Sequence, residues 1–286
     1  MTRKAIFTAA LAASVLLAGG IRSKACTNII VTRGASADNS NIISYAADSH
    51  VLYGELYFHP AAVWKAGSML EVVDWDSYRP LGSIPQVTRT YKTVGNMNEH
   101  QLIIGETTWG GRQELHDPAG IMDYGSLIYI TLQRAKTARE AIQTIIDLAN
   151  EYGYASSGES FSIADKNEAW VMDLVGKGPD NKGINYVAIR IPDGYICSHA
   201  NQARIQTFPQ NDPENCVFAP GMIAFARERG WFSGEDKDFD FLILPRTNHN
   251  VPANPYFIRR KMDYFVKHLL KEEVPSYRFT LPEELQ

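Results

Sequence analysis

The chain has 286 residues, of which 45% are hydrophobic and 21% are charged, and its formal net charge is −4. This composition is typical of a globular protein that is large enough to bury a sizeable core. The acidic balance, without a basic patch interleaved with aromatic residues, argues against a nucleic-acid-binding protein. Beyond the N-terminus, no apolar run is long enough to span a bilayer.

The first 25 residues have the pattern of a secretion signal. Arg3 and Lys4 precede an uncharged apolar run from Ala5 to Ile21, and Ser23-Lys24-Ala25 places small residues three and one positions before Cys26. A retained membrane anchor is the alternative, although the run is short for a spanning helix and contains two glycines. We therefore expect removal of residues 1–25 and export of a single domain, 26–286, to the periplasm or the medium. The cut removes four basic residues and no acid, so the net charge changes from −4 to −8.

The first half of this domain contains several short strand patterns. Strands are expected at Thr27–Thr32, Ile42–Tyr45 and Tyr53–Phe58, and a polar turn at Asn98–His100 leads into another from Leu102. Thr137 and Glu140 form a capping box, which opens an amphipathic helix that ends near Gly153.

The second half begins with a series of alternating β patterns. Strands are expected at Phe161–Ile163, Ala169–Leu174, Tyr186–Ile191 and Tyr195–His199, with Pro192-Asp193-Gly194 as the turn of a hairpin between the last two. Helices are expected at Pro220–Arg229 and, after the N-cap Asn254, at Pro255–Leu270, with an extended loop over Gly230–Asn254. This order of elements predicts an α+β fold with antiparallel sheets.

Cys26 is the strongest candidate for catalysis. The cut before it would leave a thiol and a free α-amine on one residue, and an α-amine titrates at roughly 7.7–8.0, so it can act as the base for the thiol. A structural cysteine beside a cleavage site is one alternative. A bacterial lipoprotein is another, in which lipid would block both groups, but Ser23 and Lys24 fit a lipidation signal poorly.

The other cysteines and the histidines allow fewer conclusions. Cys197 and Cys216 either form a disulfide, which leaves Cys26 as the free thiol, or are buried and unpaired. The seven histidines have no metal-binding spacing, and motifs for phosphate or dinucleotide binding are missing from the sequence. No metal or organic cofactor is therefore expected.

A series of short motifs resembles, in order, the PepD-like cysteine dipeptidases. The motifs are Cys26-Thr27-Asn28-Ile29-Ile30-Val31, Asp48-Ser49, Asn98-Glu99-His100, Gly105-Glu106-Thr107-Thr108, Gly158-Glu159-Ser160-Phe161, Glu168-Ala169-Trp170-Val171 and His199-Ala200-Asn201-Gln202-Ala203-Arg204-Ile205. These enzymes are N-terminal-nucleophile hydrolases, and penicillin V acylases and bile-salt hydrolases are more distant relatives. The resemblance extends from Cys26 to about Phe232. It implies a four-layer αββα sandwich, in which helices flank two largely antiparallel sheets, and hydrolysis of short peptides, mainly dipeptides.

The resemblance also implies roles for three catalytic residues. Cys26 corresponds to the nucleophile, Asp48 to an acid that orients the α-ammonium or the thiol proton, and Asn201 to an amide that stabilises the oxyanion. An Asx turn is the alternative for Asp48, and a turn residue after a strand is the alternative for Asn201.

Four further residues are candidates for substrate binding: Glu106, Thr107, Glu159 and Arg204. Either Glu106 or Thr107 would bind the substrate amine or assist the oxyanion. Arg204 would hold the C-terminal carboxylate of a peptide through its forked guanidinium, or would brace a loop.

The sequence departs from its relatives in two respects. Many carry an arginine three residues before the acid that corresponds to Asp48, where this chain has Tyr45. An arginine there would favour the thiolate, so its replacement affects the expected rate and substrate choice. Relatives also usually extend well beyond the position of Gln286, so we expect either a truncated chain or a shorter variant.

These observations together predict an exported cysteine dipeptidase whose partners are small peptides, with no nucleic acid and no membrane after signal removal. Two alternatives remain open at this point. One is an amidase or acylase acting on N-acylated amino acids or penicillin-like amides. The other is a non-catalytic lipoprotein that carries lipid on Cys26.

Overall fold

The structure is a computed structural model that describes residues 26–48, 54–246, 269–270 and 275. The signal peptide predicted at 1–25 and most of the helix predicted at 255–270 lie outside these residues, so both stay predictions. Within the described ranges, no helix is both long and apolar enough to cross a membrane.

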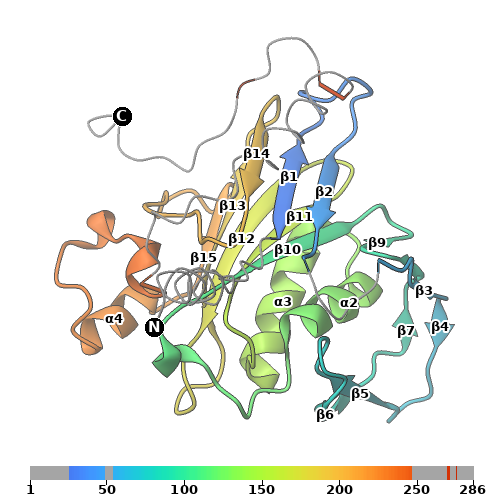
Figure 1. The fold of residues 1–286 in the computed structure, drawn as a ribbon, viewed down its shortest axis with the longest axis horizontal. Coiled ribbons are helices and arrows are strands. Elements are labelled where there is room, and N and C mark those ends of the chain that lie inside the picture. The colour runs from blue at the N-terminus through green and yellow to red at the C-terminus, as the bar shows by residue number, and fades with distance from the viewer. Residues whose placement is uncertain (1–25, 49–53, 247–268, 271–274, 276–286) are drawn as a thin grey trace, which may run out of the picture.

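Two antiparallel sheets form the body of the protein (Figure 1). The smaller sheet has the order β14-β1-β2, with β1 at Thr27–Val31, β2 at Ile42–Ala46 and β14 at Ile196–His199. The larger sheet has the order β15-β13-β12-β11-β10-β9-β8-β3. Its strands are β3 (Phe58–His59), β8 (Thr93–Val94), β9 (Met97–Asn98), β10 (Ile103–Trp109), β11 (Gly158–Ala164), β12 (Ala169–Gly176), β13 (Ile184–Ile191) and β15 (Cys216–Phe218).

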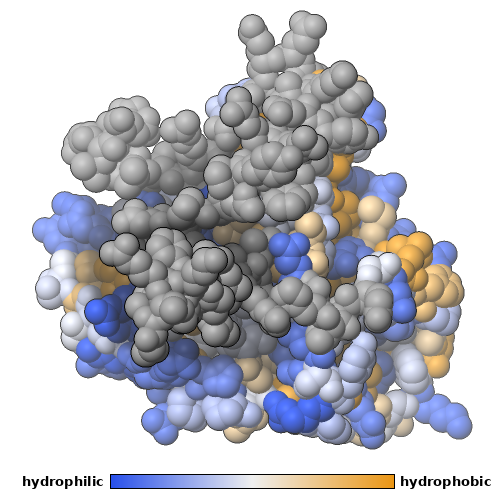
Figure 2. All heavy atoms as spheres, in the orientation of Figure 1, coloured by the Kyte–Doolittle hydropathy of each residue, from blue (hydrophilic) through white to orange (hydrophobic). Residues whose placement is uncertain are grey.

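Two further two-stranded sheets lie beside this body. The strand β4 (Ala62–Val63) pairs with β7 (Arg89–Thr90), and β5 (Met69–Val73) pairs with β6 (Pro80–Pro85). Figure 2 shows apolar atoms on the side of the molecule that carries β3 and β9. Phe58, Val94 and Met97 are among the exposed apolar residues of this region.

The larger sheet is covered on both faces. Neighbouring residues of a strand point to opposite sides, so each strand contributes buried side chains to both faces. On one face, Ala164 and Val171 pack with Ile30 of β1 and Cys197 of β14. On the other face, larger residues of β11 and β12 pack against two helices, α2 (Tyr124–Arg134) and α3 (Ala138–Tyr152). The described residues therefore form a sheet–sheet–helix arrangement, which confirms the predicted α+β fold with antiparallel sheets.

The two helices have clear N-caps. In α3, the Thr137 hydroxyl accepts a hydrogen bond from Glu140 N at 3.2 Å, as predicted, and Gly153 ends the helix with a φ of 82°. The Glu140 carboxylate accepts from Lys136 N, so the second bond of the capping box is shifted by one residue. The helix α2 has no counterpart among the predicted elements, and its N-cap is the Asp123 carboxylate, which accepts from Ser126 N.

The hairpin predicted across Pro192-Asp193-Gly194 is wrong. The strand β13 pairs with β12 and β15, whereas β14 pairs with β1 in the other sheet. The turn carries the chain between the sheets, and the Thr32 hydroxyl at the end of β1 accepts hydrogen bonds from the backbone N–H groups of Gly194 and Tyr195.

One further expectation is corrected in part, and another is confirmed. The strand predicted at Tyr53–Phe58 is wrong over residues 54–57, which have no regular structure. The helix predicted at Pro220–Arg229 is confirmed as α4 (Met222–Glu228). Within the predicted loop, short 3₁₀ turns occur at Asp236–Asp238 and Phe241–Ile243, and a third, at Gln113–Leu115, follows β10.

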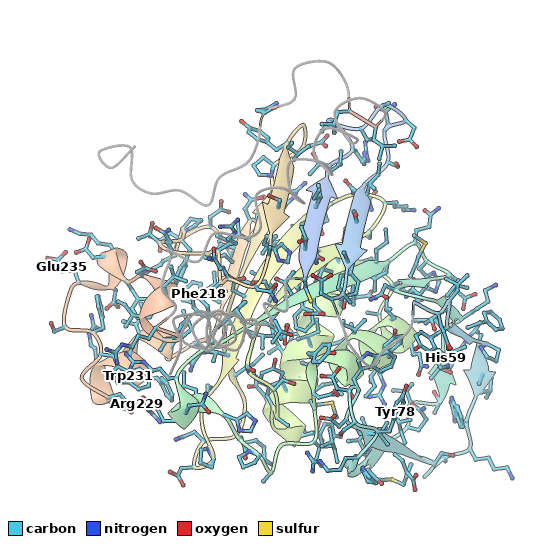
Figure 3. All side chains as sticks on the ribbon, in the orientation of Figure 1. His59, Tyr78, Phe218, Arg229, Trp231 and Glu235 are labelled. Carbon is cyan, nitrogen blue, oxygen red and sulfur yellow. The ribbon has the colours of Figure 1, made fainter. Side chains whose placement is uncertain are left out.

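Cation–π contacts hold the segment after α4. The Arg229 guanidinium lies 3.6 Å from the centre of the Phe225 ring of α4 and 5.7 Å from that of Trp231. Figure 3 labels Arg229 and Trp231. The Arg112 guanidinium, which follows β10, lies 4.0 Å from the centre of the same Trp231 ring. Such contacts stabilise packing by roughly 0.5–2 kcal/mol each.

Candidate active site

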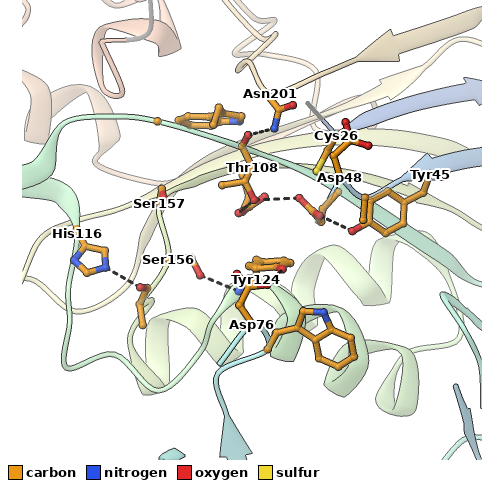
Figure 4. Close-up of a pocket in the computed structure, with 17 residues that line it drawn as sticks. Cys26, Tyr45, Asp48, Asp76, Thr108, His116, Tyr124, Ser156, Ser157 and Asn201 are labelled. Carbon is orange, nitrogen blue, oxygen red and sulfur yellow. Dashed lines mark hydrogen bonds between the residues drawn. The ribbon is translucent and has the colours of Figure 1, made fainter. Parts of the chain in front are cut away.

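A cavity of about 490 Å³ lies where the ends of β1 and β2 approach β10 and β11 (Figure 4). Its volume falls within the range of small-molecule sites, about 300–1,000 Å³. The lining includes five residues that the sequence singled out as candidates: Cys26, Asp48, Glu106, Glu159 and Asn201. Tyr45, at the position where many relatives have arginine, also lines it. Residues far apart in the sequence therefore meet around the cysteine.

The Cys26 thiol is held in a largely buried position at the start of β1. Burial raises the pKa of this thiol, and the negative charge of Glu106 raises it further. Hydrogen bonds from the backbone N–H of Asp48 and the side-chain amide of Asn201 oppose this rise, whereas the charge of the Asp48 carboxylate adds to it. The thiol is thus kept protonated by its surroundings, while two N–H donors are in place to stabilise a negative charge that develops on sulfur.

Asn201 is fixed in an unusual backbone conformation just after β14. Its φ is 44°, in the left-handed region that asparagine tolerates better than most residues. One N–H of its amide donates to the Thr108 carbonyl, with an N–O distance of 2.5 Å. Because an amide nitrogen carries two hydrogens, the second remains for the Cys26 sulfur or a nearby oxyanion.

A buried carboxylate binds the backbone of the segment that follows Asn201. Asp173 Oδ2 accepts hydrogen bonds from the backbone N–H groups of Arg204 and Ile205 at 2.6 and 2.7 Å. Its other oxygen accepts from the Ser160 hydroxyl at 2.5 Å. Asp173 on β12 therefore holds the chain just after Asn201 in place.

Two glutamates form a buried acidic pair beside Cys26. Thr108 and Glu159 are direct partners in the β10–β11 register, and Glu106 lies two residues before Thr108 on the same face. The Thr108 hydroxyl donates to Glu159 Oε1 at 2.7 Å and lies 3.3 Å from Glu106 Oε2. Burial raises the pKa of both carboxyl groups, and a hydrogen bond between them raises that of Glu159 further while lowering that of Glu106. Each of these two carboxyl groups therefore has a pKa above that of an exposed glutamate.

Tyr45 on β2 contacts this pair beside an edge of β10 that has no strand partner in the described part of the chain. On one side, β10 pairs with β9 only at Ile103 and Met97, so the edge beyond Gly105 pairs with no strand in the described part of the chain. Across this edge, the Tyr45 phenol donates to Glu106 Oε1 at 2.5 Å.

Thr107 does not line the cavity, so its role in substrate binding stays a prediction. It neighbours Glu106 on β10, so its side chain points to the opposite face of the sheet. There its hydroxyl lies 2.8 Å from His199 Nδ1, while His199 Nε2 lies 2.6 Å from the Ser162 hydroxyl. Burial lowers the pKa of His199 to about 3, so this histidine is neutral and belongs to the polar packing between the sheets.

Arg204 also lies outside the cavity lining. One of its guanidinium nitrogens lies 3.5 Å from the Ser198 carbonyl, which matches the loop-bracing alternative rather than a carboxylate receptor. Cys197 and Cys216 are free and buried, so the disulfide alternative is wrong. Burial raises the pKa of each of these two thiols to about 12, which leaves them poor nucleophiles.

The sequence did not predict the opposite wall of the cavity. Trp75 and Asp76 come from the β5–β6 turn, and Tyr124 begins α2. The Tyr124 phenol donates to Asp76 Oδ1 at 2.9 Å. Of the lining residues that were not predicted, only Thr108 could have been found from the sequence, because it belongs to the same short motif as Glu106. Among the described residues, no group of three or more acidic, histidine or cysteine side chains could hold a metal ion.

Comparison with known proteins supports the relationship that the motifs suggested. The model of peptidase family C69 matches residues 55–250. The chain is 27% identical over 256 residues to a probable dipeptidase of Salmonella dublin, which covers 81% of this chain and 55% of that protein. It is 26% identical over 222 residues to a probable dipeptidase of Latilactobacillus sakei, covering 72% and 45%. The chain thus spans about half the length of these curated relatives, and it belongs to peptidase family C69.

Proposed function

We propose that this protein is an exported cysteine dipeptidase of the N-terminal-nucleophile class. In this proposal, removal of residues 1–25 exposes Cys26, and the complete fold is a four-layer αββα sandwich. The observation that carries the proposal is the position of Cys26 in a cavity, with the Asn201 amide and the Asp48 backbone N–H directed at its sulfur. The printed names of the relatives, probable dipeptidases, supply the substrate class.

The mechanism begins with the α-amine of Cys26. Burial and the Glu106 charge disfavour a resting thiolate, so the amine takes the thiol proton as sulfur attacks the scissile carbonyl. The free N–H of Asn201 then stabilises the tetrahedral oxyanion, a contribution of about 2.7–4 kcal/mol in comparable sites. The α-ammonium protonates the leaving amino group, and water hydrolyses the resulting thioester with the amine again acting as base.

In the full-length chain, the Cys26 nitrogen is an amide and cannot take a proton. We therefore expect the 26–286 protein to hydrolyse dipeptides such as Ala-Ala and the full-length chain to be inactive. Cys26→Ser in the 26–286 protein should reduce kcat by orders of magnitude with an unchanged near-UV circular dichroism spectrum. Cys216→Ser is the matched control, because Cys216 is buried in β15 outside the cavity lining. Activity of the uncut chain, or of Cys26→Ser, would overturn the proposal.

The lipoprotein alternative is tested by mass spectrometry of the exported protein. The proposal expects a mature chain that begins with an unmodified Cys26. A diacylglyceryl adduct on that residue would exclude the dipeptidase mechanism, since the thiol would be blocked.

A further inference from the structure

A second cavity, of about 290 Å³, adjoins the catalytic one. Four residues line both cavities: Tyr45, Ala47, Trp75 and Tyr124. Ala47 immediately precedes Asp48, whose backbone N–H forms a hydrogen bond to the Cys26 sulfur. The second cavity therefore adjoins a direct contact of the nucleophile. It lies on the side of β1 that carries β2, whereas Asn201 follows β14 on the other side.

The lining of the second cavity is mainly aromatic. The Trp75 and Tyr129 rings stack with their centres 4.3 Å apart, and Tyr57 meets them edge-on, at 5.6 and 6.3 Å between ring centres. The buried Ile128 of α2 adds an aliphatic wall. Neither lysine nor arginine lines this cavity within the described residues, and its one acid, Glu55, is exposed. Such a wall suits an aromatic or large aliphatic side chain.

The two tyrosines that line both cavities direct their hydroxyl groups to the catalytic side. The Tyr45 phenol donates to Glu106, and the Tyr124 phenol donates to Asp76. Both of these acids line the catalytic cavity, and neither lines the second one. Because the hydroxyl groups are hydrogen-bonded there, the shared wall offers ring carbon atoms to the second cavity. The polarity of the wall thus changes from acidic to apolar between the two cavities.

We propose that the second cavity is a side-chain subsite, which binds an aromatic or large aliphatic side chain of one of the two residues of a dipeptide. This inference rests on the proposed dipeptidase function and adds a side-chain preference to it. A peptide that places its scissile carbonyl at the Cys26 sulfur brings the side chains next to that carbonyl close to Ala47 and the shared rings. The volume of the cavity, at the lower end of the range for small-molecule sites, suits one side chain rather than a second whole ligand.

A lysine or arginine side chain is the competing occupant, because aromatic faces and a carboxylate also bind cations. Two features of the cavity oppose it. The Trp75 and Tyr129 rings each use one face on the other. Glu55 is exposed, so water and salt screen its charge. An apolar side chain gains from contact with the rings without the cost of removing a charge from water.

The test is calorimetric binding to the 26–286 protein that carries Cys26→Ser. The probes are Ala-Ala, Phe-Ala and Ala-Phe, with Lys-Ala and Ala-Lys for the cationic alternative. We expect one of the two phenylalanine peptides to bind at least about tenfold more tightly than Ala-Ala, as burial of an aromatic side chain implies. Adding Tyr129→Ala or Tyr57→Ala should remove most of this preference, because both rings line the second cavity and not the catalytic one. Tyr152→Ala, at a partly buried tyrosine that ends α3 and lines neither cavity, is the matched control and should preserve it.

Four results would overturn the inference: no binding of any peptide, equal binding of Ala-Ala and both phenylalanine peptides, tighter binding of a lysine peptide than of either phenylalanine peptide, or a phenylalanine preference that both tyrosine variants retain. If Tyr129→Ala does not fold, Tyr57→Ala and the preference of the parent protein still decide the question. Hydrolysis of the same peptides is measured separately on the protein with Cys26 intact. Selective binding without hydrolysis would leave the subsite standing and remove the dipeptidase function. Hydrolysis of all the peptides with equal kcat/KM, together with equal binding, would do the reverse.

Discussion

Tyr45 and Glu106 are joined by a 2.5 Å hydrogen bond that links the smaller sheet to the larger one beside the Cys26 thiol. Burial raises the pKa of the Tyr45 phenol, and the Glu106 charge raises it further, so the phenol remains a donor throughout the working pH range. The bond satisfies one oxygen of Glu106 without neutralising it. Glu106 consequently still raises the pKa of the Cys26 thiol, and no arginine side chain lining the described cavity opposes it.

Replacing Tyr45 by arginine should reverse this electrostatic balance. A guanidinium beside Glu106 would favour both the carboxylate and the thiolate, so we expect a lower apparent pKa of Cys26 and faster alkylation at pH 7. The measurement is the pH dependence of iodoacetamide labelling of the 26–286 protein, read by mass spectrometry at Cys26. Tyr78→Arg is the matched control, because Tyr78 is 62% exposed and does not line the cavity. An unchanged labelling profile in Tyr45→Arg would contradict this account of the thiol.

Removing the Asn201 side chain should affect catalysis more than binding. Glycine is the appropriate replacement, because the φ of 44° would strain an alanine at this position. We expect Asn201→Gly to lower kcat by about 10²–10³ with little change in KM, as loss of one oxyanion donor does elsewhere. Steady-state kinetics on Ala-Ala measures both constants. A rise in KM with unchanged kcat would instead assign Asn201 to ground-state binding.

Much of the secondary structure followed from local pattern, but the assignment of strands to sheets did not. The strand patterns at Tyr186–Ile191 and Tyr195–His199, with a Pro-Asp-Gly turn between them, are those of a hairpin. In the fold, the second of these strands pairs with β1, more than 160 residues away, and the Thr32 hydroxyl accepts hydrogen bonds from the turn between the two strands. A short-range pattern contains no information about such a distant partner.

The candidate site shows the same limit at the level of single residues. The motif that contains Glu106 and Thr107 indicated that the segment is functional, but not which side chain faces the cavity. Side chains alternate along a strand, and of these two only Glu106 lines the cavity. The contact of Thr108 with both Glu106 and Glu159 depends on the β10–β11 register, in which Thr108 faces Glu159. Trp75 and Asp76 enter the wall through tertiary packing of the β5–β6 turn, for which the sequence has no local signal.

The buried carboxyl of Asp173 should make stability depend on pH in a defined direction. Burial raises its pKa to about 6, above the unfolded value of roughly 3.9, so the folded protein binds this proton more tightly. The associated stability is fully present below about pH 4 and is lost as the pH rises toward 6, on the order of 3 kcal/mol. Asp173→Asn cannot titrate at this position.

Urea unfolding of both proteins between pH 4 and 7 measures this effect. We expect the stability of the wild type, relative to Asp173→Asn, to fall across that window. The control is Asp147→Asn, an exposed substitution on α3. The difference in unfolding free energy between the wild type and this variant should not follow the titration of Asp173. A constant difference between wild type and Asp173→Asn would show that Asp173 does not hold its proton more tightly in the folded state.

The close approach of Gly158 and Trp109 predicts a severe effect from a single methyl group. A Cβ at Gly158 would lie 1.8 Å from a ring carbon of Trp109, whose indole N–H donates to the Ser160 hydroxyl at 2.9 Å. Gly158→Ala must therefore displace a buried ring that lines the cavity, and we expect a loss of about 1–3 kcal/mol in unfolding free energy together with lower kcat/KM on Ala-Ala. Gly54→Ala is the matched control, since a Cβ there meets nothing within 4 Å. Equal stability of the two variants in urea would mean that the indole of Trp109 does not occupy the space over Gly158. Trp109 would then not form the cavity wall at the end of β10.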